Sequence, residues 1–161
     1  MELFDLSGRV AIITGSTKGI GKAIAARMCQ HGAKVVISSR KADACEAVTA
    51  EINRDFAANG GEAISIPAHV GIEDELRNLV DKTLDKWGKI TTLVPNAAAN
   101  PYYGPSAEMP DSAFEKIWEV NVKSVFKLCH MVLPGMVEAG SGSITIIASN
   151  SGLKGSVELC G

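Results

Sequence analysis

The sequence lacks any apolar run of the length that a membrane span needs, which is about 18 to 20 residues. Its start, Met1 to Asp5, has neither the basic flank nor the hydrophobic core of a signal peptide. The formal net charge is only -2 and the basic residues are dispersed, so charge gives no reason to expect nucleic acid or an anionic membrane as a partner. We therefore expect a cytoplasmic protein with neither of these partners.

Cysteine is also scarce, and no two cysteines lie close together in the sequence. A zinc site needs closely spaced ligand pairs and a disulfide framework needs a dense cysteine pattern, and neither is present. We expect reduced thiols and no metal site. The four cysteines are Cys29, Cys45, Cys129 and Cys160.

Apolar residues are abundant by contrast, at 46% of the 161 residues, which is enough for one globular domain over residues 1–161. Strand and helix patterns alternate along the chain with short connections, which predicts an α/β fold with a parallel sheet and helices on both faces. The last helix is apolar nearly all round, so we expect it to be buried on several sides. Strands are expected at 10–13, 34–38, 63–66, 91–94 and 142–147, and helices at about 20–31, 45–56, 72–87 and 111–137.

The first strand runs directly into a glycine-rich loop and then a helix. In this setting Gly15 allows a tight turn, Gly19 lets the backbone approach phosphates, and Gly21 lets helix and strand pack closely. A nucleoside-triphosphate loop is excluded because Lys22 is followed by Ala23 rather than by Ser or Thr. The loop therefore predicts a dinucleotide pyrophosphate site formed by Gly15, Ser16, Thr17, Lys18, Gly19, Ile20 and Gly21.

The end of the second strand indicates which dinucleotide is bound. A carboxylate there would accept hydrogen bonds from the ribose hydroxyls and repel a 2′-phosphate, but this chain has Ser39, Arg40 and Lys41. Arg40 can present a planar fork to that phosphate, and Lys18 projects from the loop near the same ribose. These residues favour NADP(H) over NAD(H). The alternative is that Arg40 and Lys41 only form the solvated start of a helix.

With these motifs the chain resembles the short-chain dehydrogenase/reductases along its whole length. The family loop Thr-Gly-x-x-x-Gly-x-Gly is matched from Thr14 to Gly21, and its Asn-Asn-Ala-Gly motif is matched in part by residues 95–98 (Pro-Asn-Ala-Ala). The resemblance implies a Rossmann-type, doubly wound, three-layer sheet with strand order 3-2-1-4-5. It also implies that Asn96 helps to hold the sheet and lies near the cofactor. The cofactor-binding residues added by the resemblance are His69, Val70, Asn96, Ala97 and Ala98.

The same resemblance assigns two catalytic positions. Asn121 matches the family Asn that supports a proton relay, although by itself an Asn on an apolar helix is expected to bond to backbone. Ser149 matches the catalytic Ser of Ser-x-x-Gly and would hydrogen-bond a substrate carbonyl oxygen, with Ser151 as the competing assignment. Residues 96–105 resemble the substrate-side loop of carbonyl-reducing members, or are packed locally. The implied reaction is hydride transfer between nicotinamide and a small-molecule carbonyl or alcohol substrate.

One expected feature is absent from the sequence. The family has a Tyr about a dozen residues after the catalytic Ser and a Lys four further on, and losing such a positioned acid typically costs about 10²- to 10⁴-fold in rate. The sequence ends at Gly161, and neither Tyr102 nor Tyr103 is followed by Lys at that spacing. We therefore expect the amino-terminal portion of a longer enzyme, nearly inactive alone, that forms a homodimer or homotetramer through its long helix. The alternative is a non-catalytic nucleotide-binding or scaffold protein of half length.

Overall fold

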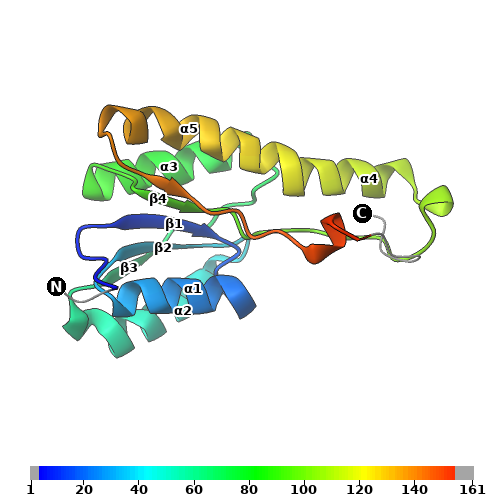
Figure 1. Ribbon diagram of the computed structural model, residues 1–161. Helices are drawn as coiled ribbons and strands as arrows, with labels where there is room; N and C mark the ends of the chain where they lie inside the picture. The colour runs from blue at the N-terminus through cyan, green and yellow to red at the C-terminus, as the bar shows by residue number, and fades with distance from the viewer. Residues whose placement is uncertain (1–3, 155–161) are drawn as a thin grey trace.

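The computed structural model describes residues 4–154, and it contains one five-stranded parallel sheet between two layers of helices (Figure 1). The strand order is β3-β2-β1-β4-β5, which confirms the expected doubly wound topology. Helices α1 and α2 cover one face of the sheet, and α3 and α5 cover the other. In chain order the elements are β1 Val10–Thr14, α1 Gly19–Gln30, β2 Lys34–Ser38, α2 Ala42–Phe56, η1 Ala57–Asn59, β3 Glu62–Ser65, α3 Glu73–Trp87, β4 Thr92–Val94, η2 Ser106–Glu108, α4 Asp111–Ile117, the π-helix η3 Trp118–Lys123, α5 Ser124–Glu138, β5 Ser143–Ile144 and η4 Asn150–Gly152.

Alternate residues of the central strands enter two separate cores. Ile12 of β1 and Val36 of β2 pack with α3 and α5, whereas Ile13 of β1 and Ile37 of β2 pack with α1 and α2. All four side chains are fully buried. A strand that is covered on both faces needs apolar residues at consecutive positions, which explains why these strands are nearly continuous runs of Val and Ile.

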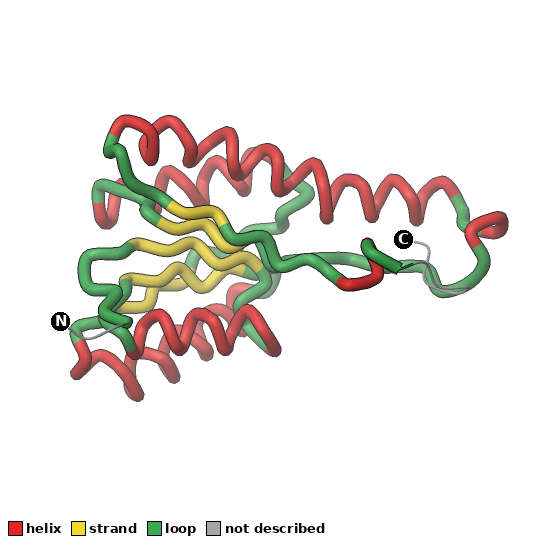
Figure 2. The backbone as a smooth tube through the Cα atoms, viewed as in Figure 1, coloured by secondary structure: helices red, strands yellow, loops and turns green. Residues whose placement is uncertain are grey.

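Strand β5 is shorter than the six residues expected. Only Ser143–Ile144 is regular strand, yet backbone hydrogen bonds continue from Thr145 N to Leu93 O at 2.9 Å and from Ile147 N to Pro95 O at 3.0 Å. Figure 2 shows the two segments leaving the sheet together beyond β4 and β5. Among the described residues β5 pairs with β4 alone, so it forms one edge of the sheet.

The opposite edge strand, β3, is covered by a side chain. Asn53 of α2 donates from Nδ2 to the carbonyl oxygen of Ala63 at 2.9 Å, and its Oδ1 accepts from Ala63 N at 2.7 Å. An exposed strand edge presents unpaired backbone groups that can pair with another chain. Asn53 satisfies one such residue and also holds α2 on the sheet.

The long helix corrects one expectation, because it is not buried on several sides. It bends through α4, η3 and α5, and only the face with Leu128, Val132 and Met136 packs into the core. The sheet and α3 lie on one side of this helix, so its apolar residues on the other side have no cover from the described part of the chain. The exposed large apolar side chains are Phe114, Trp118, Val122, Phe126, Leu133 and Val137.

The structure describes the cysteines, the possible metal ligands and the apolar helices within residues 4–154. Cys29 and Cys45 are buried free thiols and Cys129 is a half-buried one, while Cys160 lies outside the described residues. Burial raises the pKa of each of these three thiols. In the same range, no cluster of three or more His, Cys, Asp or Glu side chains is arranged to hold a metal ion. No described helix has both the length and the apolar character to cross a membrane.

Candidate cofactor site

The glycine-rich loop joins β1 to α1 with a geometry that requires glycine at two different kinds of position. Gly15 has a φ of +66°, in the left-handed region. Gly21 is limited by space instead, because a Cβ there would lie 2.5 Å from Asn96 Nδ2 and 2.6 Å from the Gly15 carbonyl oxygen. At Gly19, which begins α1, nothing lies within 4 Å of a Cβ. The loop is thus packed tightly on its inner side and open at the helix N-terminus.

Ser16 has a structural position within this loop. It is fully buried, and its hydroxyl donates to the carbonyl oxygen of Ile13 at 2.7 Å and accepts from Ser38 N at 2.9 Å. The loop backbone adds a bond from Ser16 N to Ser38 O at 3.1 Å. Ser16 therefore fixes the carboxyl ends of β1 and β2 relative to each other, and its side chain does not line the cavity described below.

Thr14 and Asn96 connect β1 to the segment after β4. Thr14 Oγ1 accepts hydrogen bonds from the backbone N–H groups of Asn96 at 3.0 Å and Ala97 at 3.1 Å. In the other direction, Asn96 Nδ2 donates to the carbonyl oxygens of Thr14 at 2.9 Å and Gly15 at 3.2 Å. Asn96 thus holds the sheet together, as expected, and also forms the wall against which Gly21 packs.

These elements surround a cavity of about 620 Å³ at the carboxyl ends of β1–β4. The structure brings most of the predicted cofactor residues together in its wall, but Ser16, Gly21 and Lys41 are not part of it. Three further residues line it that sequence reasoning missed: Ala68, Lys116 and Val120. Ala99 also lines it, and this residue belongs to the segment 96–105 that was expected to face the substrate. Lys116 and Val120 come from the long helix that also contains Asn121, and only the fold shows which residues of this helix line the cavity. The wall consists of Gly15, Thr17, Lys18, Gly19, Ile20, Ser39, Arg40, Ala68, His69, Val70, Asn96, Ala97, Ala98, Ala99, Lys116 and Val120.

The charge of this wall has one sign. It contains three cations, Lys18, Arg40 and Lys116, and no carboxylate. None of the three forms a salt bridge within residues 4–154, although five other ion pairs occur there. Unpaired cations beside an open helix N-terminus favour an anionic ligand. The open side of Gly19, the three cations and the volume of the cavity together fit a phosphorylated dinucleotide.

Asn121 lies in η3 and acts on the cavity wall through a backbone contact. Its Oδ1 accepts from Ala99 N at 2.8 Å and its Nδ2 donates to Ala99 O at 2.9 Å. The expectation of a bond to backbone is confirmed by this pair. Asn121 itself is not in the cavity wall, so it positions the segment after β4 rather than contacting a ligand there.

Ser149 lies apart from the cavity wall, just before the short helix η4. It is exposed, and its Oγ accepts a hydrogen bond from Ser151 N at 3.1 Å as the N-cap of η4. The backbone amide of Ser151 is thus a partner of Ser149. In the loop expected to face the substrate, the Tyr102 hydroxyl donates to Pro105 O at 3.0 Å, so this ring closes the loop locally.

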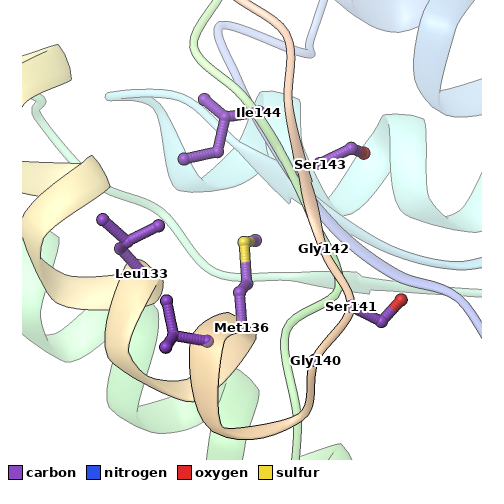
Figure 3. A pocket seen from close by; sticks show the side chains of 8 residues that line it. Leu133, Met136, Gly140, Ser141, Gly142, Ser143 and Ile144 are labelled. Atoms are coloured by element: carbon purple, nitrogen blue, oxygen red, sulfur yellow. The ribbon is translucent and has the colours of Figure 1, made fainter.

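A second hollow, of about 500 Å³, lies between the end of α5 and β5 (Figure 3). Leu133, Met136 and Ile144 project toward it, and none of its lining residues is titratable. It has neither a glycine loop nor a cation. Its chemistry therefore contrasts with that of the cavity at the glycine loop, which alone of the two has groups for an anion.

A family comparison agrees with this geometry. Residues 9–161 match the family model described as short chain dehydrogenase. The chain belongs to the short chain dehydrogenase family. Members of this family are oxidoreductases that use nicotinamide cofactors.

Two curated relatives show the extent of the similarity. Dehydrogenase/reductase SDR family member 4 of Caenorhabditis elegans is 41% identical over 148 residues, covering 91% of this chain and 55% of the relative. Tropinone reductase-like 3 of Erythroxylum coca is 41% identical over 145 residues, covering 90% of this chain and 54% of the relative. The chain spans about half the length of the curated relatives it matches.

Solved structures of the family have the same fold. A short-chain type dehydrogenase/reductase from Mycobacterium marinum has a TM-score of 0.86 at 35% identity, over 96% of this chain and 61% of that one. A 7α-hydroxysteroid dehydrogenase complexed with NADH and 7-oxo glycochenodeoxycholic acid has a TM-score of 0.85 at 35% identity, over 96% of this chain and 58% of that one. A metagenomic short-chain oxidoreductase in complex with NADP has a TM-score of 0.81 at 34% identity, over 89% of this chain and 63% of that one. Both nicotinamide cofactors thus occur among similar structures.

Proposed function

We propose that this short chain dehydrogenase domain serves an NADP(H)-dependent oxidoreductase that transfers hydride between nicotinamide and a carbonyl or alcohol substrate. The observation that carries the cofactor choice is the position of Arg40, which lines the cavity directly after β2 together with Lys18 and forms no salt bridge within residues 4–154. No lining residue of the cavity is acidic. A carboxylate at this place would repel a 2′-phosphate, and a guanidinium binds it through two hydrogen bonds. The bound cofactor supplies or accepts the hydride.

The residues have separate roles in this proposal. The loop from Gly15 to Ile20 and the N-terminus of α1 bind the pyrophosphate, and Lys18 and Arg40 bind the 2′-phosphate. Ser149 hydrogen-bonds the substrate oxygen, and Asn121 supports the proton relay by fixing the segment at Ala99. The resemblance assigns the proton exchange itself to a Tyr-x-x-x-Lys pair, which the printed sequence does not contain. Without that pair we expect the 161-residue chain to bind cofactor with little turnover.

The cofactor proposal is tested by titrating NADPH and NADH into the wild type and Arg40→Asp, with fluorescence as the readout. We expect the affinity for NADPH to fall about tenfold or more, because charge-assisted hydrogen bonds contribute about 1.5 to 3 kcal/mol, and the affinity for NADH to change little. Lys89→Asp makes the same charge change on an exposed loop outside the cavity wall and should leave both affinities unchanged. Equal losses for both cofactors in Arg40→Asp would refute the choice of NADP(H).

We also propose that the protein forms a homodimer or homotetramer through the long helix. Phe114, Trp118, Val122 and Phe126 recur every four residues along one exposed stripe of α4, η3 and α5. An apolar stripe of this length is unusual on a monomer surface. The double variant Trp118→Lys, Phe126→Lys should sediment as a smaller species than the wild type, whereas Leu84→Lys on α3 should not. A wild type that sediments as a monomer would contradict this proposal.

A further inference from the structure

The third cation of the cavity wall, Lys116, has no role in the cofactor binding proposed above. It lies in the last turn of α4, where it is half-buried and lines the cavity. Within residues 4–154 its ammonium takes part in no ion pair and no hydrogen bond. The four-carbon stem of a lysine is flexible, so its charge is available to a ligand in this part of the cavity.

The acidic residues on the same helix do not neutralise Lys116. Glu115 is exposed and outside the cavity wall, and adjacent residues of a helix do not face each other. Glu119 comes three residues later, but its carboxyl carbon lies toward the segment after β3, 3.5 Å from the position of a Cβ at Gly71. None of the ion pairs in the described part of the chain joins either carboxylate to Lys116.

The fold places Lys116 and Arg40 at different sides of the cavity. Arg40 follows β2, and β2 and β4 lie on opposite sides of β1. The long helix borders the segment after β4, because the Asn121 side chain pairs with the backbone of Ala99. Lys116 precedes Val120, another lining residue, by about one helical turn, and α4 continues past the carboxyl ends of the strands (Figure 1). Lys116 thus borders the part of the cavity next to the segment after β4.

The phosphates of a dinucleotide already have partners in the other part of the cavity. In the proposed function Lys18 and Arg40 bind the 2′-phosphate, and the glycine loop and the N-terminus of α1 bind the pyrophosphate. The loop follows β1, which lies between β2 and β4, so the nicotinamide riboside of the cofactor extends toward β4. This part of NADP(H) carries no phosphate. An anion at Lys116 therefore has to come from the second ligand, the substrate.

We propose that Lys116 binds a carboxylate of the substrate, so that this site prefers carbonyl or alcohol compounds with a negative charge over their neutral analogues. This inference rests on the proposed function. An ammonium and a carboxylate form a charge-assisted hydrogen bond, which is stronger than a neutral one. The neighbouring lining side chains are apolar and offer a neutral substrate no comparable group, namely Ala97, Ala98, Ala99 and Val120.

The test uses the 161-residue chain with saturating NADPH and two ketones, 4-acetylbenzoate and its methyl ester. The fluorescence of the bound NADPH reports binding of either ketone. We expect the wild type to bind the acid about tenfold or more tightly than the ester, which is the effect of one charge-assisted hydrogen bond. Lys116→Met keeps a long unbranched side chain without the charge, so the preference should fall to about threefold or less. The affinity for NADPH should stay within about threefold of the wild type.

Lys123→Met, on the exposed side of η3 and outside the cavity wall, is the matched control and should keep the wild-type preference. Thermal unfolding shows whether each variant is folded, and Lys116→Gln is a second neutral variant if Lys116→Met is not.

Three results would overturn the inference alone. They are a wild type that does not prefer the acid, including one that binds neither ketone; an unchanged preference in a folded neutral variant of Lys116; and a tenfold loss of NADPH affinity in that variant, since the ammonium would then bind a cofactor phosphate. Failure of the wild type to bind NADPH would overturn the proposed function, and the inference with it.

Discussion

The side-chain amide of Asn121 pairs with both backbone groups of Ala99, accepting from its N–H at 2.8 Å and donating to its carbonyl oxygen at 2.9 Å. Two backbone groups that no neighbouring strand satisfies are thereby paired at the wall of the cavity beside the glycine loop. The contact lies between the π-helix η3 and the segment after β4, which are 22 residues apart in sequence. It holds the long helix against the segment after β4, which forms the wall of the cavity beside the glycine loop.

Asn121→Asp should therefore destabilise the protein. The carboxylate retains an acceptor for Ala99 N but faces Ala99 O without a donor, so we expect a loss of about 1 to 3 kcal/mol in the free energy of unfolding. Urea denaturation at neutral pH measures it. Asn78→Asp, on the exposed face of α3 with no side-chain hydrogen bond within the described residues, should change stability far less. Equal effects of the two substitutions would show that the Ala99 contact contributes nothing specific.

Two Thr→Val substitutions should change the free energy of unfolding in opposite directions. Thr14→Val removes the acceptor of two backbone N–H groups at a site that is 1% exposed, and should cost about 1 to 3 kcal/mol. Thr49 Oγ1, on α2, is buried and has no hydrogen-bond partner in the described structure, so Thr49→Val should stabilise the protein by about 1 kcal/mol. Thermal or urea unfolding of both variants decides this, and a destabilised Thr49→Val would contradict the assignment of an unpaired hydroxyl.

Two Gly→Ala substitutions should also change the free energy of unfolding in opposite directions. At Gly21 the new Cβ would meet Asn96 Nδ2 and the Gly15 carbonyl oxygen, so the loop and the wall of the cavity must move apart. We expect weaker NADPH binding and lower stability, by about 1 to 3 kcal/mol, as for other overpacked sites. Gly135, within α5, has nothing within 4 Å of a Cβ, and alanine there should stabilise the helix by about 0.5 to 1 kcal/mol. Unchanged cofactor affinity in Gly21→Ala would refute this packing role.

Glu62 of β3 should make stability depend on pH in the acid range. Burial by itself would raise the pKa of this carboxyl, but the hydrogen bonds from Lys86 and Trp87 and the positive charges of Lys86 and Lys34 together hold the pKa below its usual value. Because the folded-state pKa is the lower one, the stabilisation is present above the unfolded-state pKa. It is lost as the pH falls through the folded-state pKa.

Glu62→Gln should consequently lower the free energy of unfolding at pH 7 by less than about 1 kcal/mol, the range of partly exposed ion pairs. The difference from wild type should shrink on acidification and vanish once Glu62 is protonated in the folded protein. Urea unfolding at a series of pH values measures it. Glu138→Gln, at the exposed end of α5 and in no ion pair of the described chain, serves as the control. A difference that grows toward acid pH would contradict the sign of the shift.

Particular elements show what could be read from the residues and what could not. The alternation of strands and helices and the glycine loop were predictable from local signals, namely the buried Val and Ile runs and the Gly15–Gly21 spacing, whereas the order of strands in the sheet was implied by the family resemblance. The role of Ser16 could not be predicted, since its hydroxyl accepts a hydrogen bond from Ser38 N, which is 22 positions away in sequence. Lys116 was missed although Asn121 on the same helix was assigned to the site by the resemblance, because no local pattern shows which residues of that helix meet the cavity.

The sequence by itself determined the alternation of strands and helices, the glycine loop and the sign of charge after β2. Each of these depends on a residue and its near neighbours, through backbone preference, side-chain period or formal charge. Only the tertiary structure decided which apolar face of the long helix is buried and which predicted residues meet in the cavity. Burial and hydrogen bonding of these groups depend on contacts between segments that the fold, and no local pattern, brings together.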